Sequence, residues 1–325
     1  MVARIARALG ERRPHGRTSL RMAIGDDAAI WEPRSGHEAI LSTDWFLEAS
    51  HFDRENHPAD SIGWKCLARA ASDIAAMGGE PRCFLLSLAL PSSHTGRWLD
   101  EFLRGLKRAS RRLRCSVAGG DTTRNERILI GVTVVGEVRK GCALLRSGAR
   151  LGDAIFVTGR PGEAELGLME LRAAKSSHYS RHPKNSRIRK HMYPEPRLAV
   201  GQWLAHRKIP TAMMDLSDGL SSDLARLCAA SGVGAEIEER RLALAQAPGK
   251  NNESPEDLLE AALHGGDDYE LLFTASERNA RRIPPRVGGV KVTRIGMIVL
   301  GSNVLRVRSN GKKEVLPAQG WDPFL

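Results

Sequence analysis

The feature that most constrains the fold is a regular alternation of short apolar segments with longer amphipathic ones. Strands are predicted at 38–44, 82–90, 115–120, 128–138, 153–159, 211–215, 234–238 and 269–275. Helical periodicity lies between them, at 60–77, 95–114, 162–174, 195–206 and 218–230. A polar turn near 139–148 separates two comparable sets of segments. The pattern predicts a mixed α/β chain with two domains, residues 1–145 and 146–325.

The chain has 325 residues, 42% of them hydrophobic, which is enough for two substantial cores. No apolar run of about 18 residues occurs, and the arginine-rich start does not fit a signal peptide. The five cysteines form no Cys-x-x-Cys pair, which disfavours a zinc knuckle or a disulfide framework. We therefore expect a cytoplasmic protein without a membrane span, with reduced, structural cysteines at positions 66, 83, 115, 142 and 228.

The net charge of +11 raises the question of nucleic-acid binding. Residues 172–191 hold seven Lys or Arg and no acid, and we expect a Ser-, His- and Pro-containing loop there, with Tyr179 as its one aromatic residue. A second basic stretch, 104–114, has the spacing of an amphipathic helix with a solvated basic face. Because aromatic residues are not interleaved with the basic ones, a specific nucleic-acid partner is not expected. A small anionic substrate fits this charge better.

Eight aspartates fall where predicted strands or helices meet loops. If the strands share a sheet, these carboxylates collect at one edge, where ligands usually bind in α/β folds. Clustered carboxylates repel one another unless cations lie between them, and hard oxygen ligands suit Mg²⁺. Mg²⁺ is usually shared with substrate phosphates, so the pattern predicts a polyphosphate site with more than one metal. The eight are Asp26, Asp27, Asp44, Asp73, Asp121, Asp215, Asp218 and Asp267.

The stretch "MDLSDGL" allows two interpretations of its acids. In the first, Ser217 or Asp218 is the N-cap of the helix that follows, and Asp215 is an incidental acid at a strand end. In the second, Asp215 and Asp218 hold metal against phosphate, with Ser217 facing the nucleotide. Asp223 lies five residues after Asp218, about 140° around an ideal helix, so we expect it to face elsewhere.

Asp73 is predicted near the last turn of a helix that begins at a cap formed by Asp60 or Ser61. A carboxylate there faces the negative end of the helix dipole, which folding alone does not favour. Asp73 is therefore either a metal ligand or the ion-pair partner of Arg69, one turn earlier.

No P-loop, protein-kinase or Gly-x-Gly-x-x-Gly motif occurs. The segments "GDDAAI", "STDWFLEASHF", "GWKCLARAASDIAAMGGEPR", "GGDTTR", "LLRSGARLGD", "MDLSDGL", "GGDDYELLF" and "GWDPF" resemble the thiamine-monophosphate kinase family, within the aminoimidazole-ribonucleotide-synthetase superfamily. The resemblance covers nearly the whole chain. It implies an N-terminal domain that forms a β-barrel with that of a second copy, and a C-terminal α/β sandwich that completes the cleft. It also implies a homodimer that transfers the γ-phosphoryl of ATP to thiamine monophosphate.

The resemblance also implies roles for individual residues. ATP contacts fall at Gly120, Asp121, Arg146 and Ser217, and thiamine monophosphate contacts at His51, Asp267 and Trp321. No general base is expected, because the acceptor phosphate, with a second pKa of about 6, is already ionised at neutral pH. The implied ligands of Mg²⁺ are Asp27, Ser42, Thr43, Asp44, Asp73, Asp121, Asp215 and Asp218.

The chain departs from the family pattern in three places. Asp267 stands where the family usually has Glu, a His that often precedes the final Phe is absent, and the basic stretch from 175 to 191 is expanded. Two rival functions remain open. One is a synthetase of the same superfamily with another acceptor, although a selenophosphate synthetase would need a reactive Cys near the N-terminus and the first here is Cys66. The other is a basic nucleic-acid binder.

Overall fold

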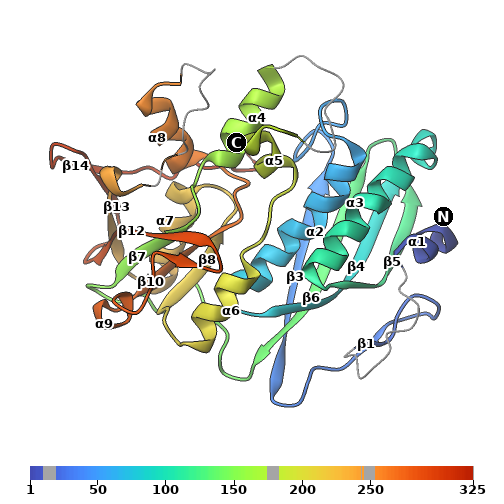
Figure 1. Cartoon of the computed structure of the whole chain (residues 1–325), viewed down its shortest axis with the longest axis horizontal. Helices are drawn as coiled ribbons and strands as arrows, with labels where there is room; N and C mark the ends of the chain where they lie inside the picture. Colours follow the sequence, from blue (N-terminus) through green and yellow to red (C-terminus); the bar gives the residue numbers. More distant parts are fainter. Residues whose placement is uncertain (10–19, 174–182, 243, 245–252, 325) are drawn as a thin grey trace.

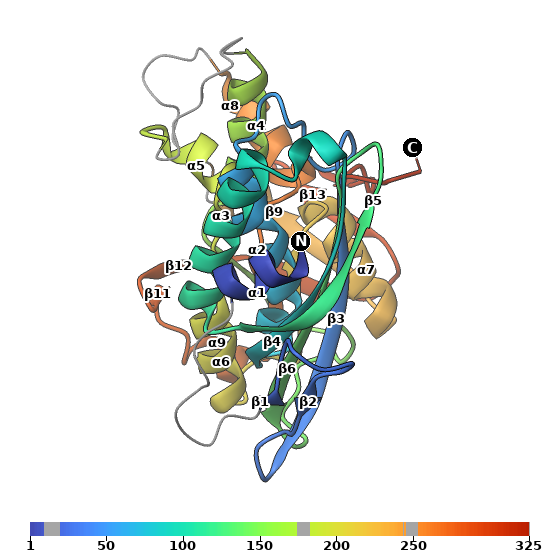
Figure 2. The same ribbon diagram turned by 90° about the vertical axis from the view of Figure 1, so that its right-hand side faces the viewer.

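A computed structural model describes residues 1–9, 20–173, 183–242, 244 and 253–324. Its N-terminal half is built on a four-stranded sheet in the order β3 (His37–Leu47), β6 (Leu129–Arg139), β4 (Glu80–Leu90), β5 (Ser116–Arg124). Helices α2 (Ala59–Ala76) and α3 (Arg97–Leu113) cover one face of this sheet (Figures 1 and 2). The core between them includes Phe46, Phe84 and Phe102.

The other face of the N-terminal sheet is only partly covered. The short strands β1 (Leu20–Met22) and β2 (Ile30–Trp31) pack near Cys83 and Ala118 on this face. Helix α1 (Val2–Leu9) contacts α3, and its buried Ile5 and Leu9 belong to the core on the helix-covered face. Large apolar side chains on the partly covered face lie in solvent: Leu41 is 68% exposed, Trp45 61% and Leu85 39%. In the part of the chain that the structure describes, no second layer of helices covers this face of the sheet (Figure 2).

The C-terminal half is built on a mixed sheet. Its strands run in the order β14 (Lys313–Val315), β13 (Val304–Val307), β9 (Gly234–Glu238), β12 (Val290–Val299), β7 (Ala154–Thr158), β10 (Glu270–Ala275) and β8 (Ala212–Leu216), with β11 (Arg286–Val287) paired to β12. One core joins this sheet to α7 (Leu220–Ser231), and another joins its opposite side to α6 (Leu198–His206). The remaining helices are α4 (Glu163–Ala173), α5 (Ser186–Met192), α8 (Pro255–His264), α9 (Glu277–Ala280) and the 3₁₀ turns Ser92–His94 and Glu239–Arg241.

Helix α2 links the two halves. Its middle packs on the N-terminal sheet, while Ala75 and Ala76 at its end belong to the core of the C-terminal sheet, and the helix contacts β8. The last turn of α2, which carries Asp73, is thereby held close to the end of β8. No helix among the described residues is both long and apolar enough to cross a membrane.

Every predicted strand and helix is confirmed, with ends shifted by a few residues. The prediction that the basic stretch 104–114 belongs to an amphipathic helix is also confirmed, because the apolar residues of α3 are buried. Two predictions about strand ends are wrong: Asp44 and Asp121 lie inside β3 and β5, because both strands continue beyond the apolar runs. The cap prediction for α2 is wrong too, since the N-cap is Pro58 and no side chain caps the helix.

The basic stretch 172–191 is only partly a loop. Residues 174–182 lie outside the described part, but Ser186–Met192 form α5, with Asn185 as its N-cap. Arg187 is buried against Glu170 and Glu253, and Lys190 pairs with Glu270 at 2.5 Å. Internal ion pairs therefore neutralise these two basic side chains, Arg187 and Lys190, within the fold.

Candidate active site

A cavity of about 310 Å³ lies where the two halves meet. The three residues predicted to contact the substrate, His51, Asp267 and Trp321, all line it, together with Ser217 and Asp218. Residues far apart in the sequence thus line the same cavity. The order of the motifs in the sequence does not reveal this proximity, since it depends on the packing of α2 between the sheets.

Trp321 is attached to the turn that precedes α7. Its backbone N–H donates to the carbonyl of Asp218 at 2.8 Å, and a side chain at Gly320 would overlap that same carbonyl. The ring of Trp321 is 41% exposed and lies 5.3 Å from the ring of His51, centroid to centroid. Burial, with a contribution from Arg69, lowers the pKa of His51 to about 4. His51 is therefore neutral at physiological pH, and its Nδ1 accepts from the Leu47 N–H at 3.1 Å.

Asp267 is held in a fixed conformation. Its backbone has φ of +67°, and its N–H donates to the carbonyl of Ser217 at 2.8 Å. One carboxylate oxygen accepts from Lys65 Nζ at 2.7 Å and the other from the Tyr269 hydroxyl at 2.6 Å. Burial opposes ionisation of Asp267, but Lys65 and His191 outweigh it and hold its pKa below the usual range. Sequence reasoning missed Lys65, although a lysine on the apolar face of a helix is a signal of such a buried pair.

Four of the predicted metal ligands form one electrostatic group: Asp44 of β3, Asp73 of α2, Asp215 of β8 and Asp218. Burial raises the pKa of Asp44 to about 6, and the charges of Asp73 and Asp218 add to the rise. Burial and Asp73 raise the pKa of Asp215 to about 8. The Ser42 hydroxyl donates to the Asp73 carboxylate, which makes no ion pair with Arg69 in the described structure. The ion-pair interpretation of Asp73 is therefore wrong.

The other predicted ligands lie apart from this group. The Thr43 hydroxyl is hydrogen-bonded to Thr133 at 3.0 Å, and side-chain alternation places it on the opposite face from Ser42 and Asp44. Asp27 is exposed between β1 and β2. Asp121 is exposed on β5, where the register pairs it with Ser87.

Two of the predicted ATP contacts, Gly120 and Arg146, lie outside the acidic group. Gly120 has φ of +148°, and a side chain there would overlap the Leu86 carbonyl, so this position of β5 accepts only glycine. Arg146 is exposed, and its carbonyl accepts from the Ser231 hydroxyl at 3.3 Å.

The turn before α7 is organised by Asp223, which corrects two expectations. The N-cap residue is Gly219, so neither Ser217 nor Asp218 caps the helix. Asp223, expected to face elsewhere, is fully buried, and its Oδ2 accepts from the backbone N–H groups of Ser217, Asp218 and Gly219 at 3.1, 3.1 and 3.2 Å. The helical-wheel argument failed because the chain reverses before α7 begins and brings these N–H groups to Asp223.

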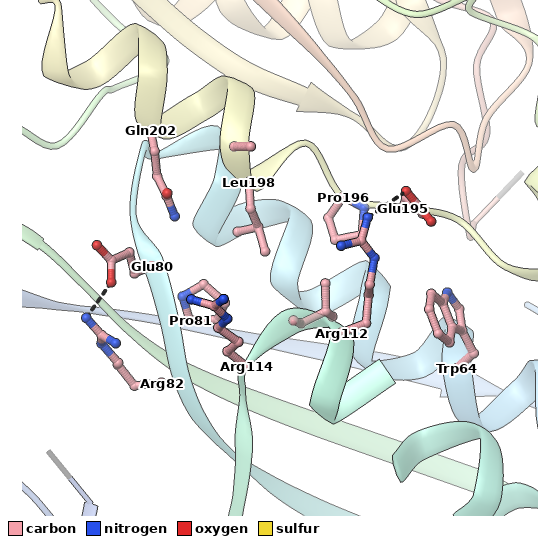
Figure 3. Close-up of a pocket in the computed structure, with 12 residues that line it drawn as sticks. Trp64, Glu80, Pro81, Arg82, Arg112, Arg114, Glu195, Pro196, Leu198 and Gln202 are labelled. Carbon is pink, nitrogen blue, oxygen red and sulfur yellow. Dashed lines mark hydrogen bonds and ion pairs between the residues drawn. The ribbon is translucent and has the colours of Figure 1, made fainter. Parts of the chain in front are cut away.

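A second cavity, of about 370 Å³, lies between α3, β4 and α6 (Figure 3). Four of its charged residues pair with one another: Arg82 with Glu80, and Arg112 with Glu195 at 3.4 Å. It contains none of the predicted site residues. The smaller cavity, beside the acidic group, is therefore the candidate active site.

No group of three or more His, Cys, Asp or Glu side chains in the described residues is close enough to form a preassembled metal site. The donors nevertheless fit Mg²⁺, because they are hard oxygens and because two of them have pKa values raised by crowding and burial. An ion that takes one or two carboxylates and completes its shell with substrate phosphates does not need a full protein cage.

Comparison with known proteins gives consistent matches. Residues 25–138 match the N-terminal domain model of AIR-synthase-related proteins, and residues 150–304 match the C-terminal domain model. The thiamine-monophosphate kinase of Escherichia coli K12 is 36% identical over 316 residues, which cover 95% of this chain and 93% of that protein.

Solved structures agree over the same length. The thiamine-monophosphate kinase of Stenotrophomonas maltophilia superposes with a TM-score of 0.82 at 33% identity and covers 96% of both chains. AaThiL complexed with AMPPCP and TMP superposes with a TM-score of 0.76 at 33% identity and covers 92% of both chains. With both domain models matched in order and relatives aligned almost end to end, this chain belongs to the thiamine-monophosphate kinase family of AIR-synthase-related proteins.

Proposed function

We propose that this chain transfers the γ-phosphoryl group of ATP to the phosphate of thiamine monophosphate, giving thiamine diphosphate and ADP. The observation that carries the proposal is the cavity lined by His51, Asp267 and Trp321 directly beside Ser217 and Asp218. One pocket thus combines residues suited to an aromatic cation with the turn suited to a nucleotide. The relatives named above support the same reaction.

The cavity walls suit the thiazolium ring of the acceptor. Trp321 presents an aromatic face, which attracts cations. His51, with its pKa lowered to about 4 chiefly by burial, adds a second ring without positive charge, so it does not repel the thiazolium. The Asp267 carboxylate, fixed by Lys65 and Tyr269, supplies negative charge at the same wall.

The chain's own residues need only position the reactants. The acceptor is a phosphate monoester with a second pKa of about 6, so no side chain has to remove a proton before transfer. The turn at Ser217–Gly219 is rigid because Asp223 binds its three N–H groups. We assign Gly120, Asp121, Arg146 and Ser217 to ATP, with the glycine allowing close approach of the β5 backbone.

We assign Mg²⁺ to the acidic group, with Asp44, Asp73, Asp215 and Asp218 as its centre. Mg²⁺ held by these carboxylates would supply positive charge that offsets the negative charge developing during phosphoryl transfer. Ser42, Asp27 and Asp121 complete the proposed set, and Thr43 belongs to it through its backbone carbonyl, because its hydroxyl points to the other face.

The proposal includes a homodimer whose N-terminal sheets close into a barrel. The exposed Leu41, Trp45 and Leu85 support it, because apolar side chains of this size gather on a face that another molecule covers. A domain boundary at 145/146 fits the gap between the matched segments 25–138 and 150–304. We also propose a cytoplasmic location, which the five free cysteines support.

The test is ADP release by the purified chain with ATP, Mg²⁺ and one acceptor at a time. Thiamine monophosphate should stimulate release, while aminoimidazole precursors, selenide and single-stranded RNA should not. Stimulation by another acceptor, with none by thiamine monophosphate, would overturn the proposal. Selenide is already disfavoured, because Cys66 is buried in α2 and burial raises the pKa of its thiol to about 12.

A further inference from the structure

Arg69 differs from the other basic side chains in the interior of this protein. Its guanidinium lies over the ring of Phe46, 5.2 Å from the centroid, and it lines the candidate active-site cavity. Its Nε is buried with no hydrogen-bond partner, and none of the described residues forms an ion pair with Arg69. A cation in this position has donors that the protein itself does not use.

Other buried basic side chains near Arg69 do have ion-pair partners. Lys65, one turn earlier on α2, pairs with Asp267 at 2.7 Å. Arg197 and Lys190 both pair with Glu270. A guanidinium removed from water without a partner is costly, so an anion that is not part of the chain is the expected partner of Arg69.

The nearby acids do not fill this role. Both oxygens of Asp267 are taken, by Lys65 and by the Tyr269 hydroxyl. Asp218 is paired with Arg226. Asp44 and Asp218 contribute to the field at Arg69 without an ion pair to it. The guanidinium of Arg69 thus lines the cavity without an ion-pair partner among the described acids.

The position of Arg69 indicates which anion it binds. The cavity that it lines has His51 and Trp321 at the ring-binding wall and Ser217 and Asp218 at the nucleotide turn. A thiamine ester with its ring against Trp321 places its phosphate between these two walls. A guanidinium presents a planar set of donors that matches two oxygens of a phosphate, which a lysine ammonium cannot do.

We propose that Arg69 binds the phosphate of thiamine monophosphate and holds it in line with ATP. This inference rests on the proposed function. In the transfer, one oxygen of the acceptor phosphate forms a bond to the γ-phosphorus, and the bond from the γ-phosphorus to the β,γ-bridging oxygen breaks, releasing ADP. No proton moves. Arg69 offsets charge on the acceptor oxygens that do not react, and so reduces repulsion between two anionic phosphates.

The experiment compares binding of thiamine monophosphate, unphosphorylated thiamine and a nonhydrolysable ATP analogue by calorimetry. Arg69→Met should weaken thiamine monophosphate binding roughly ten- to a hundredfold, the loss expected for charge-assisted hydrogen bonds. Thiamine and nucleotide binding should change less than about twofold, and Arg69→Lys should bind thiamine monophosphate with intermediate affinity.

Arg108→Met is the matched control. Arg108 lies over Trp64 and Tyr193 and also has a buried Nε without a partner, but it does not line this cavity. It pairs with Asp60 at 2.5 Å, so its loss should lower the melting temperature and leave all three affinities unchanged.

Equal losses for thiamine and thiamine monophosphate in Arg69→Met would show that Arg69 only shapes the pocket, and would overturn the inference. A loss confined to the nucleotide would overturn it as well. Unchanged binding of all three ligands would show that Arg69 does not bind the phosphate, but it would not contradict the proposed function. Failure of the wild-type chain to bind thiamine monophosphate would overturn both.

Discussion

At the scale of single residues, Asp73 is the clearest example of a side chain whose position is explained by function and not by stability. It lies in the last turn of α2, where the helix dipole disfavours a negative charge, and it adds to the charge that raises the pKa of Asp44 and Asp215. Its one hydrogen bond among the described residues comes from Ser42, itself a predicted ligand. No basic side chain in the described ranges forms an ion pair with Asp73.

Asp73→Asn should therefore abolish or severely reduce phosphoryl transfer, while the metal-free protein stays at least as stable as the wild type. The amide keeps the size of the side chain and removes the repulsion with Asp44 and Asp215. Thermal melts in EDTA and steady-state rates at saturating Mg²⁺ measure the two effects.

Asp60→Asn on the same helix is the control. Asp60 is buried, and its carboxylate accepts from Arg108 at 2.5 Å and from the Tyr193 hydroxyl at 2.9 Å. This variant should melt at a lower temperature and keep its kinetic constants. An Asp73→Asn protein that behaves in the same way would exclude Asp73 from the metal site.

At the scale of elements, the turn between β8 and α7 depends on one side chain within the helix. Asp223→Ala removes the acceptor of three backbone N–H groups and should destabilise the protein by about 2 to 3 kcal/mol. Because Ser217 lies in that turn, the KM for ATP should rise as well. Urea unfolding and initial rates at varied ATP measure these changes.

Asp257→Ala provides the comparison, since Asp257 forms an exposed capping box with Ser254 at the start of α8. Its loss should destabilise the protein less than Asp223→Ala does and leave the KM for ATP unchanged. If Asp223→Ala is destabilised but binds ATP normally, the turn does not position the nucleotide.

Glu270 joins β10 to the segment that contains α5 and the start of α6. Burial opposes its ionisation, but Lys190 and Arg197 lower its pKa to about 2. Since the folded-state pKa is below the ordinary value, the stabilisation is complete above about pH 4.5 and is lost as the pH falls toward 2. Glu270→Gln should thus be less stable than the wild type by about 3 kcal/mol at pH 7, with a smaller difference near pH 3. Urea unfolding at both pH values tests this, and a difference independent of pH would contradict it.

The elements were predictable from the sequence because their apolar periodicity is local. Helix α5 was missed because it has only Ile188 and Met192 as buried apolar side chains, and the burial of Arg187 depends on Glu170 and Glu253, which are distant in the sequence. Asp223 was misjudged because its partners are backbone groups, which leave no pattern in side-chain identity. Lys65 and Arg69 were missed as site residues because their roles depend on how α2 packs between the sheets.

At the scale of the whole molecule, the open face of the N-terminal sheet is the feature that one copy of the chain does not explain. Across this sheet, Trp45 of β3 pairs with Gly131 of β6, Gly131 with Ser87 of β4, and Ser87 with Asp121 of β5. At the usual strand spacing, these three steps separate Asp121 from Trp45 by roughly 14 Å. Asp121 thus lies on the far edge strand from Asp44.

Trp45→Glu should convert a dimeric wild-type enzyme into a monomer and abolish activity, because a charge replaces an apolar side chain at the proposed interface. Sedimentation velocity measures the change. Leu300→Glu is the control, since Leu300 is 82% exposed at the end of β12 and should remain dimeric and active. A monomeric wild-type enzyme with full activity would contradict the barrel.

The hydrogen bond from Trp321 to the Asp218 carbonyl has a consequence for synthesis of the protein. All acids of the proposed site have been synthesised once translation reaches residue 267, but Trp321 is added 54 residues later. A nascent or truncated chain that stops after β14 would carry the nucleotide turn, His51 and Asp267 but lack the aromatic ring of Trp321. If Trp321 holds the thiamine ring as proposed, a fusion partner placed close after this residue should impair selectivity for the acceptor before it impairs nucleotide binding.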